Sequence, residues 1–392
     1  MILINGARQT GKSTLAQGLA EHGHEARYIT LDNATDLAAA TNDPEGFIDG
    51  LTGPVILDEI QCAPKLFPAI KRAVDRNRIP GRFLLTGSAN VLLLPTLSES
   101  LAGRMEIHTL WPFSAGELSG CPESFMNKIF ADTPLPFYTR SESREDLLAR
   151  IQCGGYPEIV SRRSVKRRDA WFGAYITTIL QRDVRDIADI DYLTSMPRLL
   201  ALLAARTATN LNYSEISRCI GLPLSTLKRY MALLETTFLI QLLPPWSSNL
   251  GKRLVKTPKV FLTDTGLVWH LLGAPQSDAG WEHPMIGPLL ENFVVMELRK
   301  QLSWNDQFVR LFHVRTQTGQ EVDILLEDRR GCIVGIEVKS SASVSANDFK
   351  HLRYMADTLG KRFLRGIVLY TGENTVPFSS NLFALPITSI WN

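Results

Sequence analysis

The residues with the most specific chemistry stand near the start of the chain, where Gly6 to Ser13 match G-x-x-x-x-G-K-[ST] at every fixed position. An apolar run, Ile2–Ile4, precedes them and a predicted helix, Ser13–Glu21, follows them. This is the strand–loop–helix context that a phosphate-binding loop requires, and it disfavours the alternative of a chance glycine-rich turn. Backbone N–H groups of such a loop face a polyanion, and its glycines let the backbone close around the ligand.

The loop predicts a site for ATP and Mg²⁺, with Lys12 at the β- and γ-phosphates and the Ser13 hydroxyl on the metal ion. A second apolar run, Val55–Leu57, ends in Asp58 and Glu59. We expect Asp58 to lie near the Mg²⁺ and Glu59 to orient or deprotonate the attacking water, although such a run by itself is often only a strand that enters a polar turn. The predicted nucleotide-binding residues are Gly6, Ala7, Arg8, Gln9, Thr10, Gly11, Lys12, Ser13, Thr14 and Asp58.

A third apolar run, Phe83–Thr86, leads into a polar segment. Ligands of parallel sheets bind beyond the carboxyl ends of the strands, so Thr86, Ser88 and Asn90 are candidates for a position beside the γ-phosphate. The alternative is that Ser88 or Asn90 caps the next helix.

A second group of charged residues lies in the last third of the chain. Asp323 belongs to an alternating strand, Glu321–Leu326, and a later strand ends in Glu337 and Lys339. Residues two apart in a strand face the same side, so Glu337 and Lys339 project together, and Asp323 can join them if the strands form a hairpin. Carboxylates bind hard divalent cations, and an adjacent lysine can position or activate water; Glu291, on a predicted helix, is a further candidate ligand.

The order Glu, Asp, Glu-x-Lys resembles the PD-(D/E)XK nuclease fold, especially that of archaeal Holliday-junction resolvases. The resemblance implies that Glu291, Asp323 and Glu337 are metal ligands and that Lys339 is catalytic. E-x-K is common on apolar strands, and many relatives of this fold have lost activity. A domain that only binds a partner is therefore the alternative.

The motifs in combination resemble a bacterial and archaeal AAA+-like ATPase family whose members carry a C-terminal domain of unknown function, DUF4143. The similar segments are G-A-R-Q-T-G-K-S-T, V-I-L-D-E-I-Q, L-L-T-G-S-A-N, S-L-A-G-R, Gly154–Pro157, Leu180–Val184, Gly251–Leu254, Asp264–Leu267 and Glu291–Lys339. They extend over nearly the whole chain. The resemblance implies an AAA+-like fold that uses ATP and Mg²⁺.

The same resemblance concerns two further features. An arginine in the position of Arg104 could act in trans as a finger on a neighbour's γ-phosphate, which would make a homo-oligomer possible; the alternative is a surface arginine that pairs with Glu99 or Glu106. Family members usually have some tens of residues before the first strand, which help to hold the nucleotide base, whereas this P-loop begins at Gly6. We therefore expect the given sequence to lack that support for the adenine.

The middle of the chain predicts a helix-turn-helix. Ser214 can cap a short helix that ends at Gly221, and Ser225 can cap a second helix that carries Lys228 and Arg229. The apolar strand Phe238–Leu243 and the Lys252–Phe261 stretch could form the wing of a winged-helix domain. Residues 225–260 hold one acidic residue, Glu235, and six basic residues, which are Lys228, Arg229, Lys252, Arg253, Lys256 and Lys259.

This local basic surface is suited to the phosphate backbone of DNA, which we expect as a partner; a winged helix that only contacts protein is the alternative. A second basic cluster precedes Trp171 and is interpreted as a solvated helix face. It consists of Arg162, Arg163, Lys166, Arg167 and Arg168.

These elements predict an α/β chain of three parts. They are an N-terminal P-loop AAA+-like parallel sheet (1–115), a helical, winged-helix-like middle (116–275) and a C-terminal α/β, restriction-endonuclease-like domain (276–392). The 392 residues carry a net charge of only +2, so a DNA-binding surface must be local. No apolar run is long enough to span a membrane, and five scattered cysteines argue against a disulfide framework. We expect a cytoplasmic protein.

Overall fold

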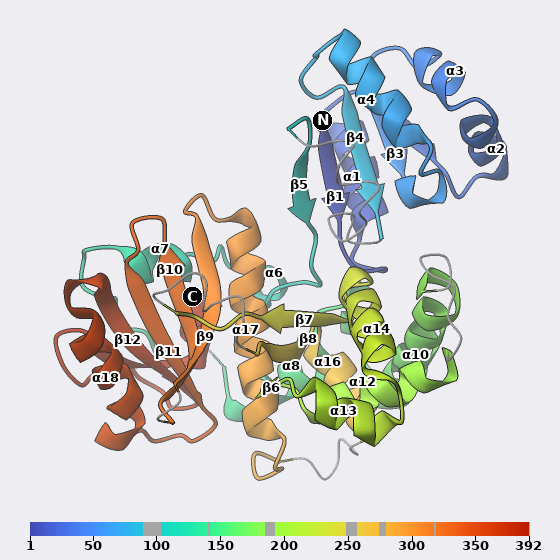
Figure 1. Cartoon of the computed structure of the whole chain (residues 1–392). Helices are drawn as coiled ribbons and strands as arrows, with labels where there is room; N and C mark the ends of the chain where they lie inside the picture. Colours follow the sequence, from blue (N-terminus) through green and yellow to red (C-terminus); the bar gives the residue numbers. More distant parts are fainter. Residues whose placement is uncertain are drawn as a thin grey trace. The chain divides into compact units, whose positions relative to one another are not determined.

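The computed structural model describes residues 1–88, 103–139, 142–184, 193–247, 257–273, 280–316 and 319–391 (Figure 1). The chain forms two compact units, one of residues 1–112 and 229–239 and the other of residues 113–228 and 240–392. Five residues discussed above, Asn90, Glu99, Lys252, Arg253 and Lys256, lie outside the described part. Among the helices that the structure describes, none is both long enough and apolar enough to cross a bilayer.

A five-stranded sheet, parallel throughout, is the centre of the first unit. Its order is β2 (Arg27–Thr30), β3 (Val55–Asp58), β4 (Phe83–Gly87), β1 (Ile2–Asn5) and β5 (Glu106–Thr109). Strands β1, β3 and β4 lie where the apolar runs predict them. Because β4 lies between β1 and β3, its polar C-terminal end is flanked by the P-loop and by the Asp58-Glu59 pair.

The helices of the first unit are α1 (Lys12–His22), α2 (Ala34–Asn42), α3 (Pro44–Asp49), η1 (Ile60–Cys62) and α4 (Leu66–Arg76). Helix α1 contacts β2, β3 and β4 and thereby fixes the P-loop at the end of β1. In α4 the buried residues Leu66, Ile70 and Ala73 recur at helical spacing, so one face of this helix enters the core with Leu57 and Leu85.

Helices dominate the first part of the second unit. They are α6 (Ala115–Ser119), α7 (Phe125–Phe130), α8 (Arg144–Cys153), α9 (Pro157–Val160), α10 (Val165–Thr178), η3 (Ile179–Asp183), η4 (Leu193–Ser195), α12 (Met196–Ala205), α13 (Tyr213–Ile220) and α16 (Thr265–Leu272). Helix α14 (Leu224–Thr236) includes residues of both units.

Both predicted caps of the helix-turn-helix are wrong in position. The cap of α13 is Asn212, whose side chain accepts the N–H of Glu215, because the helix begins at Tyr213 and already includes Ser214. Helix α14 begins at Leu224, so Ser225 lies inside its first turn.

Two sheets complete the second unit. The smaller is antiparallel, in the order β6 (Thr209–Asn210), β8 (Lys259–Leu262), β7 (Ile240–Leu243). The larger is mixed, in the order β13 (Val376–Pro377), β14 (Leu382–Pro386), β12 (Phe363–Tyr370), β11 (Ile333–Lys339), β10 (Glu321–Asp328), β9 (Val309–Arg315).

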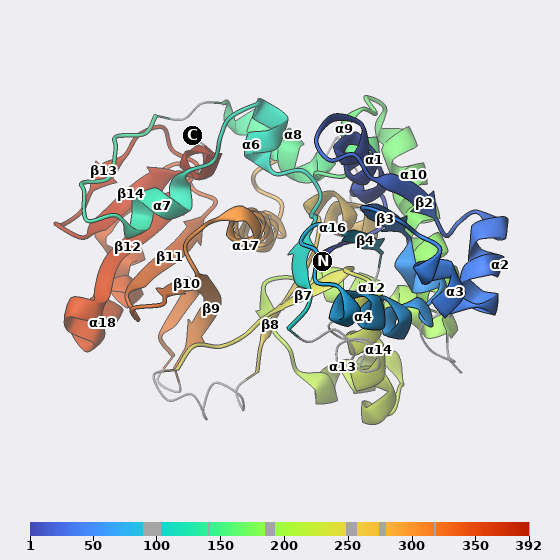
Figure 2. The same ribbon diagram turned by 90° about the horizontal axis from the view of Figure 1, so that it is seen from above.

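The flanking helices of the larger sheet are α17 (Ile286–Trp304), which contacts β11, and α18 (Lys350–Leu359), which packs on β10, β11 and β12. Three short helices accompany them, η5 (Ala346–Phe349), η6 (Gly360–Arg362) and η7 (Ile387–Trp391). Figure 2 shows strands β9 to β12 side by side, with α18 against them. Strand β9 was not expected from the sequence, because buried His313 interrupts its apolar alternation.

Candidate functional site

The P-loop has the backbone that its sequence predicts. Gly11 adopts a left-handed conformation with φ of 94°, and Gln9 adopts one with φ of 64°. A side chain at Gly6 would overlap the carbonyl oxygen of Leu110, so only glycine fits at that position. These constraints curl the loop around the end of β1 and present it to a ligand at the N-terminus of α1.

Lys12 lies inside this loop. Its ammonium donates hydrogen bonds to the carbonyl oxygens of Gly6 and Ala7 at 3.0 and 2.7 Å, and only 4% of the residue is exposed. The side chain of Thr10 also donates to the carbonyl oxygen of Ala7, at 3.0 Å. The positive charge is thus held by the loop itself, where phosphate oxygens would meet it.

Asp58 joins the loop to the neighbouring strands. Its carboxylate accepts hydrogen bonds from the hydroxyls of Ser13 at 3.1 Å, of Tyr28 at 2.7 Å, and of Thr86. The carboxylate is buried, with 3% of the residue exposed. The Ser13 hydroxyl and the Asp58 carboxylate therefore lie together at the loop, and these two oxygen ligands fit Mg²⁺ bound with a nucleotide.

Tyr28 is a site residue that the sequence reasoning missed. It lies on β2, which pairs with β3, and its hydroxyl reaches across to Asp58. Burial and this carboxylate raise the pKa of Tyr28 to about 12, so the hydroxyl keeps its proton and remains a donor. Only the parallel pairing of β2 with β3 could have indicated this contact, and no local sequence motif predicts that pairing.

Glu59 stands at the turn after β3 in a left-handed conformation, with φ of 58°, which is uncommon for a residue other than glycine. Its backbone N–H donates to the Thr86 hydroxyl at 3.0 Å. Its carboxylate accepts from the amide of Gln61, and the same amide donates to the Ser88 hydroxyl at 3.0 Å. Thr86 thus contacts Asp58 and Glu59, and Ser88 contacts Gln61, whereas a position of either beside a γ-phosphate stays a prediction. Gln61 is a second residue that the motifs did not reveal.

Arg104 has a partner within its own chain. Its guanidinium binds both carboxylate oxygens of Asp75 on α4, at 2.6 and 3.0 Å, and holds the pKa of Asp75 below its usual value. The expected surface pair with Glu106 is not the one that forms, and Glu99 lies outside the described residues.

The C-terminal candidates also come together. Strands β10 and β11 form the antiparallel hairpin in which Ile324 pairs with Ile336, so Asp323 lies beside Glu337. The Asp323 carboxylate accepts the backbone N–H of Val338 at 3.0 Å, and the ammonium of Lys339 lies 3.7 Å from Glu337. The predicted hairpin and the shared face are therefore confirmed.

A lysine that was expected on the basic surface occupies this cluster. The ammonium of Lys259, on β8, lies 2.9 Å from Glu291, 3.0 Å from Glu321 and 3.6 Å from Asp323. Only 2% of its side chain is exposed, so counting Lys259 among DNA-binding residues was wrong. Among the residues the structure describes, no group of three or more His, Cys, Asp or Glu is arranged to hold a metal ion.

The ionisation of the cluster follows from its burial. Burial, with the nearby charge of Asp323, raises the pKa of Glu291 to about 8 despite the attraction of Lys259. Burial and Asp323 likewise raise the pKa of Glu337. Burial opposes the charge on Lys259, but the carboxylates of Glu291, Asp323 and Glu321 outweigh it and hold its pKa above the usual value.

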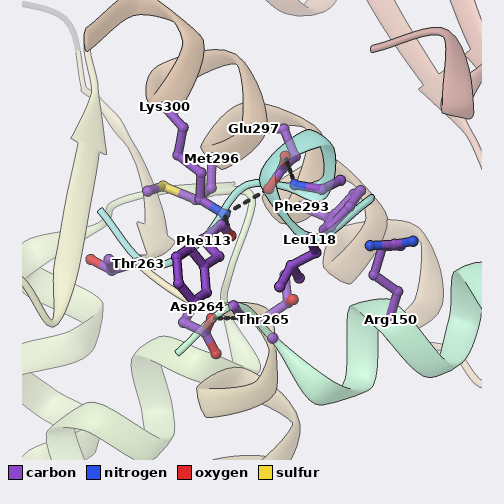
Figure 3. A pocket seen from close by; sticks show the side chains of 13 residues that line it. Phe113, Leu118, Arg150, Thr263, Asp264, Thr265, Phe293, Met296, Glu297 and Lys300 are labelled. Carbon is purple, nitrogen blue, oxygen red and sulfur yellow. Dashed lines mark hydrogen bonds and ion pairs between the residues drawn. The ribbon is translucent and has the colours of Figure 1, made fainter. Parts of the chain in front are cut away.

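A small pocket in the second unit gathers two of the motifs that resemble the AAA+-like family (Figure 3). Asp264 accepts the backbone N–H groups of Gly155 at 2.7 Å and Leu267 at 3.1 Å, and thereby caps α16. A side chain at Gly154 would overlap the Asp264 carboxylate, which explains the glycine. Nearby, Lys300 pairs with Glu297 and donates to the carbonyl of Phe113 at 3.0 Å.

We expect Asp264→Ala to destabilise the protein by about 3 kcal/mol, because it leaves two buried N–H groups without an acceptor and removes a helix cap. Asp264→Asn keeps one acceptor and should cost less. Asp357→Ala, which removes an exposed carboxylate on α18, is the matched control. Chemical denaturation measures the three free energies of unfolding; equal values for Asp264→Ala and the control would refute this role.

Comparisons with known proteins agree with the N- and C-terminal motifs. Residues 1–119 match the AAA domain, 144–278 match a domain of unknown function (DUF8612), and 286–390 match a second one (DUF4143). The uncharacterized protein Rv2008c of Mycobacterium tuberculosis (strain ATCC 25618 / H37Rv) is 32% identical over 391 residues, covering 100% of this chain and 80% of the relative. The uncharacterized protein Mb2031c of Mycobacterium bovis matches equally well.

The chain belongs to this family of AAA-domain proteins with a C-terminal DUF4143 domain. The resemblance deduced from the motifs is confirmed to that extent, and the AAA domain makes the N-terminal part a P-loop ATPase domain. Two structures of the Thermotoga maritima RuvB Holliday junction branch migration motor also match, with 16% and 17% identity. Each match covers 61% of this chain and 80% of the other, with TM-scores of 0.27 and 0.26, which are too low to relate the folds.

Several exposed basic residues of this AAA-domain protein lie on helices of the middle of the chain. Lys228 and Arg229 are exposed on α14, and Arg218 is exposed on α13. The basic cluster before Trp171 is largely exposed, in agreement with its interpretation as a solvated face. Its exposed members are Arg163, which precedes α10, and Lys166 and Arg167 on α10.

Proposed function

We propose that the chain binds ATP with Mg²⁺ at the P-loop and hydrolyses it. The observation that carries the proposal is the cluster of Lys12, Ser13, Asp58, Glu59 and Thr86 at the carboxyl edge of one parallel sheet. Loop N–H groups and the Lys12 ammonium would bind phosphate oxygens, and Ser13 and Asp58 would hold the metal ion. When bound, Mg²⁺ would neutralise charge that develops on the phosphate oxygens.

In this proposal Glu59 supplies the base. Its carboxylate would orient the attacking water and accept its proton. The hydrogen bond from Gln61 and the contact between the backbone of Glu59 and Thr86 limit the positions that this carboxylate can take. Gln61 is thus a positioning residue that also contacts Ser88 at the end of β4.

We further propose that the middle of the chain binds DNA. The elements follow one another as α12, β6, α13, α14, β7 and β8, and the three strands form one antiparallel sheet, which is the order of a winged-helix domain. Exposed Lys228 and Arg229 on the second helix of the helix-turn-helix supply positive charge for phosphate contacts. An ATPase assay with and without DNA over a series of salt concentrations tests whether the two activities are coupled.

We expect the double variant Lys228→Ala/Arg229→Ala to bind duplex DNA of every sequence more weakly. If both residues contact phosphates, the slope of log K against log salt should become less steep by about 1.8. The matched control is Lys166→Ala/Arg167→Ala, which removes the same charge from the exposed face of α10. Fluorescence anisotropy measures both; equal losses in the two variants would show only a general charge effect.

A second candidate function is a slow nucleotide switch whose C-terminal domain binds a partner without cleaving DNA. The lysine at the centre of the acidic cluster favours it over a metal-dependent nuclease formed by Glu291, Asp323, Glu337 and Lys339. A switch should hydrolyse ATP poorly and without stimulation by DNA. A role of Arg104 in trans, and with it a homo-oligomer, would require the arginine to leave Asp75.

A further inference from the structure

The acidic cluster of the second unit has a built-in positive charge. Lys259 reaches it from β8, whereas Glu291 comes from α17, and Glu321 and Asp323 come from β10. The ammonium lies within 3.6 Å of all three carboxylates, two of them at 3.0 Å or less. A single side chain thus connects the three-stranded sheet, the long helix and the six-stranded sheet.

Burial makes this arrangement obligatory. An isolated ammonium with 2% of its side chain exposed would be very costly. Without it, the carboxylates of Glu291 and Asp323, whose side chains are 13% and 17% exposed, would repel one another. Each sign of charge is stable here only because the other is present. One oxygen of Glu337, a residue that is 5% exposed, has no hydrogen-bond partner and lies beside the same group.

We propose that Lys259 is the resident cation of this cluster and stands where a nuclease-like site would hold a divalent metal ion. Its ammonium takes up the carboxylate oxygens of Glu291 and Asp323, which a metal ion would need as ligands. A metal ion beside it would meet a charge of the same sign at close range. In the C-terminal domain the carboxylates of the nuclease-like hairpin therefore pair with Lys259 and hold the β8 strand in place. The domain binds no divalent metal ion at these residues.

Thermal unfolding of the nucleotide-free full chain, with Mn²⁺ as the probe, tests this proposal. Millimolar Mn²⁺ should leave the unfolding temperature of the wild type unchanged. Lys259→Met should unfold at a lower temperature, because it leaves buried carboxylates without a counter-charge, and Mn²⁺ should raise that temperature by roughly 5 °C by taking the vacated position. Adding Asp323→Asn to Lys259→Met should remove the response to Mn²⁺.

Lys259→Arg is the matched control, since it keeps the positive charge and should bind no Mn²⁺. A folded Lys259→Met that ignores Mn²⁺ would overturn the proposal. The proposal would also be overturned if Mn²⁺ raised the unfolding temperature of the wild type but not that of the Asp323→Asn variant. If Lys259→Met does not fold, electron paramagnetic resonance can measure the binding of Mn²⁺ to the wild type and to Asp323→Asn. Equal binding to the two proteins supports the proposal. A Mn²⁺ site that is present in the wild type and absent from Asp323→Asn overturns it.

Discussion

Lys12→Ala should reduce ATP hydrolysis by roughly a hundredfold or more, because it removes the charge that would meet the β- and γ-phosphates. The effect should include weaker nucleotide binding, since the ammonium contacts ground-state phosphate oxygens as well as those of the transition state. The fold should survive. In the structure Lys12 bonds to the carbonyls of Gly6 and Ala7, which water can satisfy once the side chain is shortened.

The matched control is Lys65→Ala, which removes an exposed lysine from the turn that precedes α4 in the same unit. Phosphate release measures hydrolysis, and the anisotropy of a fluorescent ATP analogue measures binding. Normal turnover in Lys12→Ala would place the nucleotide site elsewhere, and equal losses in both variants would indicate a general effect of charge.

Glu59→Gln should bind ATP with nearly unchanged affinity and hydrolyse it roughly 10²- to 10⁴-fold more slowly. Glutamine has the size of glutamate but cannot accept the proton of the attacking water. The left-handed backbone at Glu59 and its N–H bond to Thr86 do not depend on the carboxylate, so the turn should keep its shape.

A change in the affinity for ATP as large as the change in turnover would contradict this role, because it would make Glu59 a binding residue rather than a base. Gln61→Ala provides a comparison at the same turn. It removes the side chain that donates to Glu59 while leaving the carboxylate in place.

The sequence predicts the phosphate-binding loop and the strand end beside it well, because their signals are local. The phosphate-binding loop depends on glycines at fixed spacing, and Asp58 and Glu59 follow directly from the end of an apolar strand. The same locality explains why Tyr28 and Gln61 were missed. Tyr28 reaches Asp58 only because β2 pairs with β3, and Gln61 reaches Ser88 only because β3 pairs with β4.

Lys259 shows the opposite error. Its neighbours along the chain are basic, so the sequence suggests a surface residue, yet the pairing of β8 with β7 and the approach of α17 bury it among carboxylates. Strand β9 escaped notice for a related reason. Buried His313 contacts the carbonyl of Thr257 at 3.2 Å, and such a partner from a distant part of the chain cannot be predicted from alternation.

The central claim is that Glu59 activates the water that hydrolyses ATP held by Lys12, Ser13 and Asp58. Identifying the bound nucleotide tests this claim most directly. Wild type and Glu59→Gln are incubated with radiolabelled ATP and Mg²⁺, separated from free nucleotide, quenched in acid and analysed by chromatography. We predict ADP on the wild type and intact ATP on Glu59→Gln. ADP on both proteins in equal amounts, or nucleotide on neither, would contradict the claim.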